Sequence, residues 1–370
     1  MSLSLFFLLS CTKEPADNTI IDPEIETNII LTGYQIIWGM DFLPDGDLIF
    51  TEKSGKIYRK SGDNITEITG FPAVLPSGQG GLLDICVHPD YSSNGWVYAS
   101  YSATNPEGGA QLKLIRFRIT GNQIRDIENI FSTNGSNTWF GHYGSRIVFD
   151  RDKYLFMSVG EGGSNSYGGP DASNKNAQDP KSSWGKIHRL KEDGTIPADN
   201  PLIPGNTGPS SIYSYGHRNP QGLILNPETG DIWETEHGPR GGDEVNIILK
   251  GANYGWPFYS IGVNYDGTQI SSGHNAVGIT PPLYTWTPSI GICGMAFITS
   301  DRFKSWKGNL LVSGLASHDL YRCTVSGNKI TQEVPLLTDI GRVRDVAQAP
   351  DGSIFVSVEN PGRIIRILPK

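Results

Sequence analysis

The sequence predicts an all-β fold, and within that class a six-bladed β-propeller with four-stranded antiparallel blades. Three observations predict it. The 370 residues include 45 glycines and 24 prolines, which indicates many tight turns. A short hairpin pattern recurs along the chain. No stretch longer than about ten residues has the 3.6-residue periodicity of an amphipathic helix, which argues against an α/β fold.

The recurring unit is an apolar strand, a turn containing Pro, Asp, Asn or Gly, and a second strand rich in aromatic and β-branched residues. Its six copies span residues 39–51, 82–101, 146–160, 222–235, 295–315 and 343–358. The spacing between copies leaves room for two more strands in each, so six copies predict six blades. The longer intervals carry extra loops, and loops on a rigid scaffold are where binding residues concentrate.

The N-terminus contains a short apolar run at residues 3–10, far below the length that spans a bilayer. It is typical of an export signal, and Leu8-Leu9-Ser10-Cys11 resembles the lipobox of bacterial lipoproteins. We expect a signal segment at 1–11, a polar tether at 12–28 and the propeller at 29–370, in an exported protein of the periplasm or outer membrane. Because no Lys or Arg precedes the run, a plain secretory signal or an incidental apolar N-terminus stays open.

Charge and cysteine content exclude two classes of function. Lys and Arg number 30 against 38 Asp and Glu, a net charge of −8, which disfavours a general nucleic-acid surface. Cys86, Cys293 and Cys323 are widely spaced and contain no CxxC pair. We therefore expect buried small hydrophobic side chains rather than a zinc site or a disulfide framework.

The first candidate site residue is His142, in Gly141-His142-Tyr143-Gly144, immediately before the third hairpin copy. A histidine at the start of an innermost strand can face a central cavity. Its ordinary pKa near 6.5 suits a general base that accepts a hydroxyl proton. A structural or merely exposed histidine is the alternative.

A second motif, Tyr215-Gly216-His217-Arg218-Asn219-Pro220, precedes the fourth copy. Arg218 offers a planar fork of donors for a carboxylate or an oxyanion, and Asn219 offers both a donor and an acceptor. Alternatively, Arg218 bridges blades through backbone carbonyls.

Further donors precede other innermost strands: Gln79 in Gly78-Gln79-Gly80-Gly81, and Arg342 and Arg344 before the last copy. Together with Arg218 they would converge on the axis. Unpaired cations are costly in a low-dielectric centre, so the cluster indicates an anionic ligand. The alternative is that Arg344 pairs locally with Asp345 or other carboxylates.

The loop at residues 236–246, Glu-His-Gly-Pro-Arg-Gly-Gly-Asp-Glu-Val-Asn, is a candidate site for a hard cation. Glycines let backbone carbonyls converge, and carboxylates supply the oxygen ligands that Ca²⁺ prefers. The spacing is not that of an EF-hand. A glycine-rich surface loop with a solvated acidic pair is the alternative.

Four motifs follow one another along the chain: GQGGLLDICVHPDY, GHYGSRIVFD, YGHRNPQGL and EHGPRGGDEVN, the last followed by NYGWP. In this order they resemble the soluble quinoprotein aldose dehydrogenases of the glucose/sorbosone dehydrogenase family, six-bladed propellers that use pyrroloquinoline quinone (PQQ) and calcium. The resemblance covers nearly the whole chain after residue 30. It implies oxidation of an aldose sugar at C1, with the electrons passed to an external acceptor.

The resemblance also implies residue roles. His142 would be the general base that removes the C1 hydroxyl proton, Arg218 would stabilise negative charge on the quinone oxygen, and Glu161 would orient the base. The other residues expected to bind PQQ with Arg218 are Gln79, Asn219, Arg342 and Arg344. The carbonyls of Gly238 and Pro239 would bind the catalytic Ca²⁺, and Glu244 and Tyr254 resemble ligands of a second, structural calcium ion.

Two positions depart from the glucose-specific enzymes. Those enzymes place a lysine against PQQ where this chain has Ala316, and an acidic residue before the base where it has Gly141. Both changes resemble the broader aldose dehydrogenase branch. Two other functions stay open at this point. One is a calcium-dependent propeller hydrolase such as a lactonase, and the other is a non-catalytic propeller that binds carbohydrate or protein.

Overall fold

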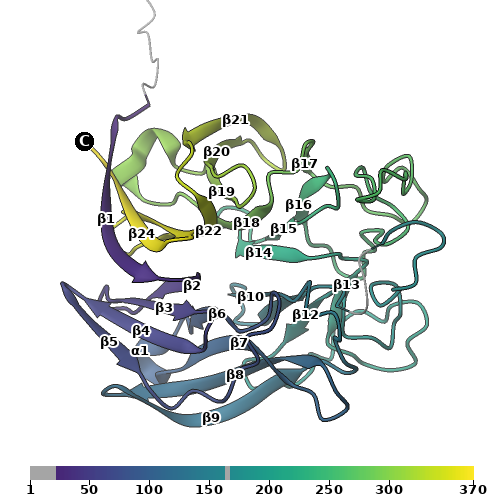
Figure 1. The fold of residues 1–370 in the computed structure, drawn as a ribbon, viewed down its shortest axis with the longest axis horizontal. Helices are drawn as coiled ribbons and strands as arrows, with labels where there is room; N and C mark the ends of the chain where they lie inside the picture. Colours follow the sequence, from purple (N-terminus) through teal and green to yellow (C-terminus); the bar gives the residue numbers. More distant parts are fainter. Residues whose placement is uncertain (1–21, 163–166) are drawn as a thin grey trace, which may run out of the picture.

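The computed structural model describes residues 22–162 and 167–370, and within them the strands form six four-stranded antiparallel sheets. The innermost strand of each sheet contacts the innermost strands of its two neighbours, which closes a ring around a central axis (Figure 1). The predicted all-β class and the six four-stranded blades are confirmed.

The blades take their strands in chain order. Blade 1 contains β2 (Ile37–Phe42), β3 (Leu48–Glu52), β4 (Lys56–Ser61) and β5 (Asn64–Ile68). Blade 2 contains β6 (Leu82–Val87), β7 (Val97–Thr104), β8 (Ala110–Thr120) and β9 (Gln123–Ser132). Blade 3 contains β10 (Gly144–Phe149), β11 (Leu155–Val159), β12 (Lys186–Leu190) and β13 (Ile212–Tyr215). Blade 4 contains β14 (Pro220–Leu225), β15 (Ile232–Glu236), β16 (Asp243–Ile247) and β17 (Tyr284–Trp286). Blade 5 contains β18 (Ile292–Phe297), β19 (Leu310–Gly314), β20 (Leu320–Val325) and β21 (Ile330–Leu337).

Blade 6 closes the ring with strands from both ends of the described chain. It contains β22 (Arg342–Gln348), β23 (Ile354–Glu359), β24 (Gly362–Pro369) and, as its outer strand, β1 (Ile25–Tyr34). β1 pairs with β24 in antiparallel register, Ile29 opposite Ile365. The propeller therefore begins at Ile25, four residues before the predicted start at 29. Residues 1–21, with the predicted signal segment, Cys11 and the first part of the tether, lie outside the described residues.

Each of the six predicted hairpins is the first pair of strands of a blade. The turn chemistry is visible in the first copy, where Leu43 N–H donates to the Asp47 carbonyl and Gly46 has a φ of +90°. Helices occur only within two of these connections in the described residues: α1 (Tyr91–Asn94) in blade 2 and a 3₁₀ helix, η1 (Asp301–Trp306), in blade 5.

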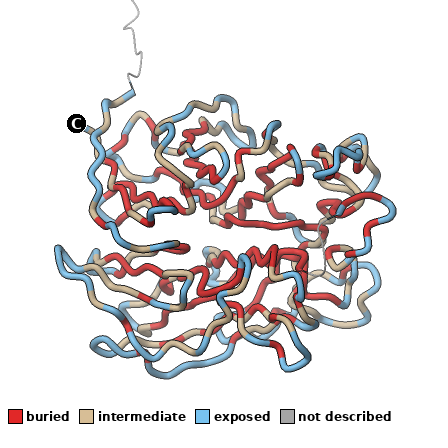
Figure 2. The backbone as a smooth tube through the Cα atoms, viewed as in Figure 1, coloured by how far each residue is buried: buried red, intermediate tan, exposed pale blue. Residues whose placement is uncertain are grey.

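The hydrophobic core lies between adjacent blades, while the outer strands face solvent (Figure 2). Between blades 1 and 2, for example, Ile49 and Ile57 pack in one cluster with Ile85 and Val97. All six residues of β23 are buried. Because the blades are fixed by this packing, the loops at the ends of the axis stand on a rigid support.

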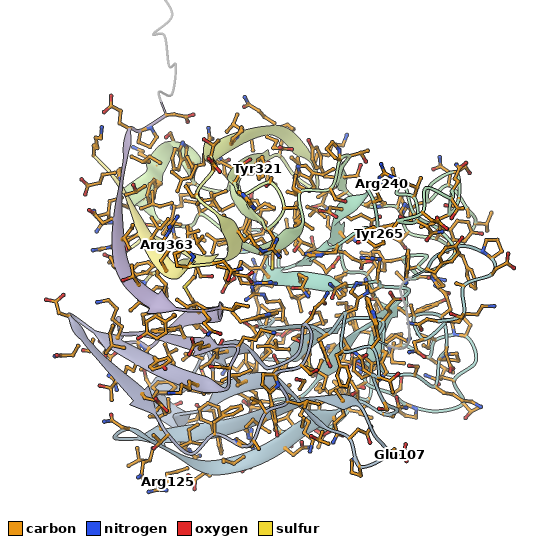
Figure 3. All side chains as sticks on the ribbon, viewed as in Figure 1. Glu107, Arg125, Arg240, Tyr265, Tyr321 and Arg363 are labelled. Carbon is orange, nitrogen blue, oxygen red and sulfur yellow. The ribbon has the colours of Figure 1, made fainter. Side chains whose placement is uncertain are left out.

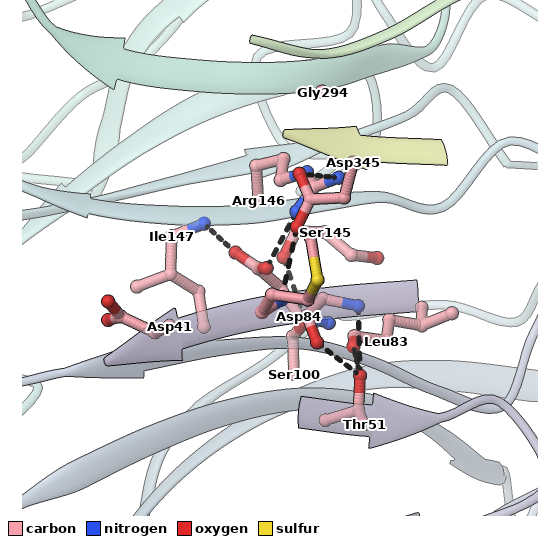
Figure 4. A network of polar contacts seen from close by, with 12 residues as sticks. Asp41, Thr51, Leu83, Asp84, Ser100, Ser145, Arg146, Ile147, Gly294 and Asp345 are labelled. Atoms are coloured by element: carbon pink, nitrogen blue, oxygen red, sulfur yellow. Dashed lines mark hydrogen bonds and ion pairs between the residues drawn. The ribbon is translucent and has the colours of Figure 1, made fainter. Parts of the chain in front are cut away.

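Buried carboxylates join the innermost strands across blade boundaries (Figure 4). Arg146 on β10 lies between two of them, with Nη1 2.9 Å from Asp84 Oδ1 and Nη2 2.8 Å from Asp345 Oδ1. The second oxygen of each accepts a backbone N–H from a neighbouring blade: Asp84 from Ile147 at 2.8 Å, and Asp345 from Met40 at 3.0 Å. This network fills the middle of the axis and fixes blades 1, 2, 3 and 6 relative to one another.

The expectation of buried cysteines is met by two of the three cysteines that the structure describes. Cys293 and Cys323 are buried free thiols as predicted, but Cys86 is only half-buried. Within the described residues, no helix combines the length and apolar character that crossing a membrane requires.

Candidate active site

The hairpin topology brings two sets of residues to one end of the axis. An innermost strand starts at this end, and the second strand of the hairpin returns to it. Residues before an innermost strand, such as His142, therefore lie near residues after a second strand, such as Glu161 and His237. Backbone hydrogen bonds join these loops, for example Glu161 N–H to the Arg218 carbonyl at 2.8 Å.

A cavity of about 230 Å³ opens between these loops. Its polar lining comes from several blades: Lys53, Gln79, Asn219, Gln221, His237, Arg342, Arg344 and Glu359. A wider cavity of about 400 Å³ shares His237 and Arg342 with it and includes Tyr265, which is 70% exposed. Tyr265 and Arg240 lie near each other beside β16 (Figure 3). We call the smaller cavity the polar cavity. The wider cavity adjoins it and is lined in part by the exposed side chain of Tyr265.

His142 is held in one orientation by its neighbours. Its backbone has a φ of +49°, and its N–H donates to Gln79 Oε1 at 2.8 Å. Its Nδ1 lies 2.9 Å from Glu161 Oε1, and the ring of Trp139 packs edge-on against it. Nε2 forms no hydrogen bond with the described residues. Burial holds the pKa of His142 well below its ordinary value, and Arg218 adds to this effect, so the imidazole is neutral at pH 7.

Glu161 is fully enclosed, with 1% exposure. Its Oε2 accepts hydrogen bonds from Trp256 Nε1 and from Asn174 Nδ2. Burial raises the pKa of Glu161 to about 8, against the lowering effects of Arg218 and of the Trp256 hydrogen bond. The structure thus brings together the two residues that the resemblance pairs, and Trp256 and Asn174 hold the carboxylate of Glu161 from its other side.

Arg218 reaches the cation-loop candidate rather than a distant blade. Its Nη1 donates to the carbonyls of His237 at 3.1 Å and Gly238 at 2.8 Å. Its guanidinium lies over the ring of Trp256, 5.2 Å from the ring centroid. Those carbonyls follow β15 of blade 4, and Arg218 directly precedes β14 of the same blade, so these two contacts stay within blade 4. The backbone carbonyl of Arg218 accepts from Glu161 N–H of blade 3, so Arg218 joins the Glu161 loop to the loop at 237–238.

Arg342 and Arg344 both lie at the polar cavity, but with a partner that the sequence analysis missed. Glu359, at the end of β23, accepts from Arg344 Nε at 2.6 Å and from Arg342 Nε at 3.2 Å. Burial alone would raise the pKa of Glu359, but the two arginines bring it below its ordinary value. Pairing of Arg344 with Asp345 is wrong, because Asp345 binds Arg146, but the alternative that Arg344 pairs with another carboxylate is borne out by Glu359.

The side-chain amides of Gln79 and Asn219 form hydrogen bonds with the backbone of the loop around His142 and Gly144. Asn219 Oδ1 accepts from Gly144 N–H at 3.2 Å and from Gln221 Nε2 at 3.0 Å, and Gln79 Oε1 accepts from His142 N–H. Both side chains line the polar cavity, and their amide nitrogens make no hydrogen bond within residues 22–162 and 167–370. These nitrogens are donors available to a ligand.

The loop at 238–242 is tightly folded. A Cβ on Gly238 would lie 2.3 to 2.4 Å from the carbonyl oxygens of Gly241 and Gly242, so only glycine fits there. Gly238 N–H donates to Asp243 Oδ1 at 2.9 Å, which anchors the loop to β16. Gly238 and Pro239 line both the wider cavity and a small pocket that also contains Glu244 and Tyr254.

Glu236 and Glu244, which line this small pocket, form a buried acidic cluster with Glu234. Burial raises the pKa of Glu234 and of Glu244, and the neighbouring carboxylate of Glu236 raises both further. Glu234 Oε1 and Asn246 Oδ1 are buried without a hydrogen-bond partner in the part of the chain that the structure describes. A hard cation fits such unsatisfied oxygen atoms.

Glu244 and Tyr254, the two residues expected to bind a structural calcium ion, differ in their contacts with this acidic cluster. Glu244 Oε1 lies 3.3 Å from His274 Nε2 within it. The hydroxyl of Tyr254 instead donates to the Ile247 carbonyl and accepts from Leu249 N–H. The structure therefore brings Glu244 and Tyr254 to one pocket but directs the Tyr254 hydroxyl away from it.

The chain is similar to known sugar dehydrogenases. The protein is an oxidoreductase, because sugar dehydrogenases match it over most of their length. The chain belongs to the glucose/sorbosone dehydrogenase family, whose model matches residues 34–366. This family membership confirms the expected enzyme and the expected resemblance.

Three similar proteins illustrate the relationship. The chain is 36% identical over 342 residues to an aldose sugar dehydrogenase, YliI, of Escherichia coli K12, with 90% of each chain covered. The crystal structure of the soluble aldose sugar dehydrogenase of Escherichia coli in the apo-form superposes with a TM-score of 0.87 and 34% identity, covering 94% of this chain and 100% of that one. The PQQ-bound aldose sugar dehydrogenase of Streptomyces coelicolor superposes with a TM-score of 0.75 and 29% identity, covering 94% and 99%.

Proposed function

We propose that the protein oxidises aldose sugars at C1 to lactones in a reaction that depends on PQQ and calcium, with His142 as the general base. The observation that carries this proposal is the His142–Glu161 pair, 2.9 Å apart at the polar cavity end of the axis. The PQQ-bound relative from Streptomyces coelicolor supports the choice of cofactor.

The polar cavity fits an anionic quinone. Among the described residues that line it, Lys53, Arg342 and Arg344 are cationic and Glu359 is the acidic one, which leaves an excess of positive charge. Burial lowers the pKa of His237 to about 4, so His237 adds no charge at pH 7. Arg218, Asn219, Gln79, Arg342 and Arg344 would hold the carboxylates and carbonyls of PQQ. When bound, the quinone supplies the acceptor for the sugar's hydride.

Calcium fits two places. The carbonyls of Gly238 and Pro239 would hold the catalytic ion, which supplies a Lewis acid beside the cofactor. The unsatisfied oxygen atoms of Glu234 and Asn246 favour a structural ion in the acidic cluster, close to Glu244 and Tyr254. Without a cation, these buried carboxylates would repel one another, because burial weakens the screening of like charges.

The proton step follows from the position of His142. The step requires Glu161 as a carboxylate, the form that prevails above its pKa of about 8. With Nδ1–H donated to this carboxylate, the lone pair of Nε2 accepts the proton of the sugar's C1 hydroxyl. Glu161 then stabilises the imidazolium, while Trp256 and Asn174 keep its carboxylate in place. The charge of Arg218 disfavours a lasting imidazolium, so His142 readily releases the proton again.

The electrons leave to an external acceptor, which completes the turnover. We also propose that the protein is exported, with Cys11 as a lipid anchor in the periplasm or outer membrane. Mass spectrometry of the mature N-terminus from membrane fractions tests this: diacylated Cys11 supports the anchor, and an unmodified chain in the soluble fraction contradicts it.

The experiment that tests the catalytic proposal uses the full chain with PQQ and CaCl₂. Aldose-dependent reduction of an artificial electron acceptor is expected, together with PQQ binding seen in the visible spectrum. Absence of both, across several aldoses, would overturn the proposal. Lactone hydrolysis without PQQ would favour the hydrolase alternative instead.

A further inference from the structure

We propose that Lys53 is a binding residue for the anionic cofactor, a role that rests on the proposed function of the cavity. Lys53 follows β3 in blade 1, so it lies at the cavity end of the axis for the same topological reason as Glu161 and His237. It lines the polar cavity together with Gln79, Arg342 and Arg344. None of the four motifs that resemble the dehydrogenase family contains it.

The backbone of Lys53 is fixed on both sides. Its N–H donates to the Ile36 carbonyl at 2.9 Å, and its carbonyl accepts from Leu82 N–H at 3.1 Å. A Cβ on Gly81 would lie 2.2 Å from this carbonyl and 2.7 Å from Lys53 Cγ. Because Gly81 has no side chain, the backbone and the side-chain methylenes of Lys53 can pack against it. Lys53 Nζ donates to the Gly78 carbonyl at 2.7 Å, and Gly78 is the residue before Gln79.

The surroundings of Lys53 place it among other cations. Burial lowers its pKa, the charge of Arg344 lowers it further, and Glu359 opposes both effects. Glu359 already binds Arg342 and Arg344, whereas the hydrogen bond of Lys53 goes to a neutral carbonyl. No carboxylate of a described residue forms a salt bridge with Lys53. The ammonium group of Lys53 therefore has N–H donors left for a ligand. An anionic group of the cofactor would accept from them in a charge-assisted hydrogen bond.

Titration of the metal-loaded protein with PQQ, followed by the visible spectrum, tests this role without measuring turnover. Lys53→Met is expected to weaken PQQ binding by roughly 10- to 100-fold, the scale of one charge-assisted hydrogen bond. Lys53→Arg, which keeps the charge, is expected to bind within a few-fold of wild type. Lys56→Met is the matched control, because Lys56 is half-exposed and pairs with Glu67 outside the cavity.

Salt separates a charge contact from a merely structural role. If Lys53 only held the loop at Gly78, its loss would weaken PQQ binding equally at all ionic strengths. A charge contact is screened, so Lys53→Met is expected to show a shallower decline of affinity with added salt than wild type. Equal affinity of Lys53→Met and wild type, or equal salt dependence, overturns the inference. Failure of wild type itself to bind PQQ is a different result, which removes the proposed function and this inference with it.

Discussion

Replacement of Glu161 by glutamine tests the proposed proton step at its most sensitive point. The two side chains have the same shape, so packing is preserved. Oε2 of Glu161 receives two donors, Trp256 Nε1 and Asn174 Nδ2. A glutamine must place its carbonyl oxygen there, which turns its NH₂ group toward Nδ1 of His142.

The consequence is a change of tautomer. Nδ1 of His142 would then accept a hydrogen bond from the amide, and the imidazole proton would move to Nε2. An imidazole with Nε2–H cannot accept the proton of the C1 hydroxyl. The loss is expected to approach that of the whole general base, roughly 10² to 10⁴ in kcat, or about 3 to 5 kcal/mol in the activation barrier.

The assay is steady-state reduction of an artificial acceptor at saturating PQQ and calcium, with PQQ affinity measured in parallel. Glu161→Gln is expected to show a large fall in kcat with unchanged PQQ affinity. Glu161→Asp, which keeps the acceptor but shortens the reach, is expected to lose less. A Glu161→Gln enzyme with turnover within about three-fold of wild type would refute the assigned tautomer.

Four further outcomes follow from the structure. His142→Ala is expected to lower kcat by roughly 10² to 10⁴ while PQQ still binds, and near-normal turnover would exclude His142 as the base. Because burial raises the pKa of Glu161 to about 8 while that of His142 stays well below 6.5, kcat/KM is expected to fall as the pH drops below about 8, where Glu161 takes up a proton; a profile that stays level down to pH 6.5 would contradict this. Calcium removal by a chelator is expected to lower the Tm, and Glu244→Gln to reduce that shift; equal Tm values with and without calcium would argue against the structural ion. Asp84→Ala is expected to cost about 3 kcal/mol of unfolding free energy in a denaturant titration, because Asp345 is then the one carboxylate among the described residues that pairs with the buried Arg146, whereas a loss below about 1 kcal/mol would show that the axial network contributes little.

The hairpins could be predicted because their signals are local. A turn such as Pro350-Asp351-Gly352 between two apolar strands specifies its own chain reversal. The closure of the ring carries no such signal. β1 and β24 lie at opposite ends of the chain, and nothing in the sequence near Ile25 indicates its pairing with Pro369.

Some residues of the candidate site could be predicted because they, too, lie in local sequence motifs. His142, Arg218 and Arg344 all precede or begin innermost strands, where the motifs are dense. Of the carboxylates considered as partners of Arg344, Asp345 was wrong, because neighbouring residues of a strand point to opposite faces: Asp345 pairs with Arg146, and Arg344 pairs with Glu359.

Lys53 and Glu359 lie outside the four motifs, and His237 belonged only to the candidate cation loop, so none of the three was predicted to line the polar cavity. All three stand at or just after the end of the second strand of a hairpin. That position was available from the predicted hairpins, since a second strand returns to the end where the first strand began. The signal that could have found them is therefore topological rather than a motif.

The most direct test of the account is a titration of the wild-type protein with PQQ in the presence and absence of calcium, followed by addition of an aldose under anaerobic conditions. Saturable, calcium-dependent binding is expected, followed by a change of the bound cofactor's visible spectrum to that of its reduced form. PQQ that fails to bind, or that binds and stays oxidised with every aldose offered, would contradict it.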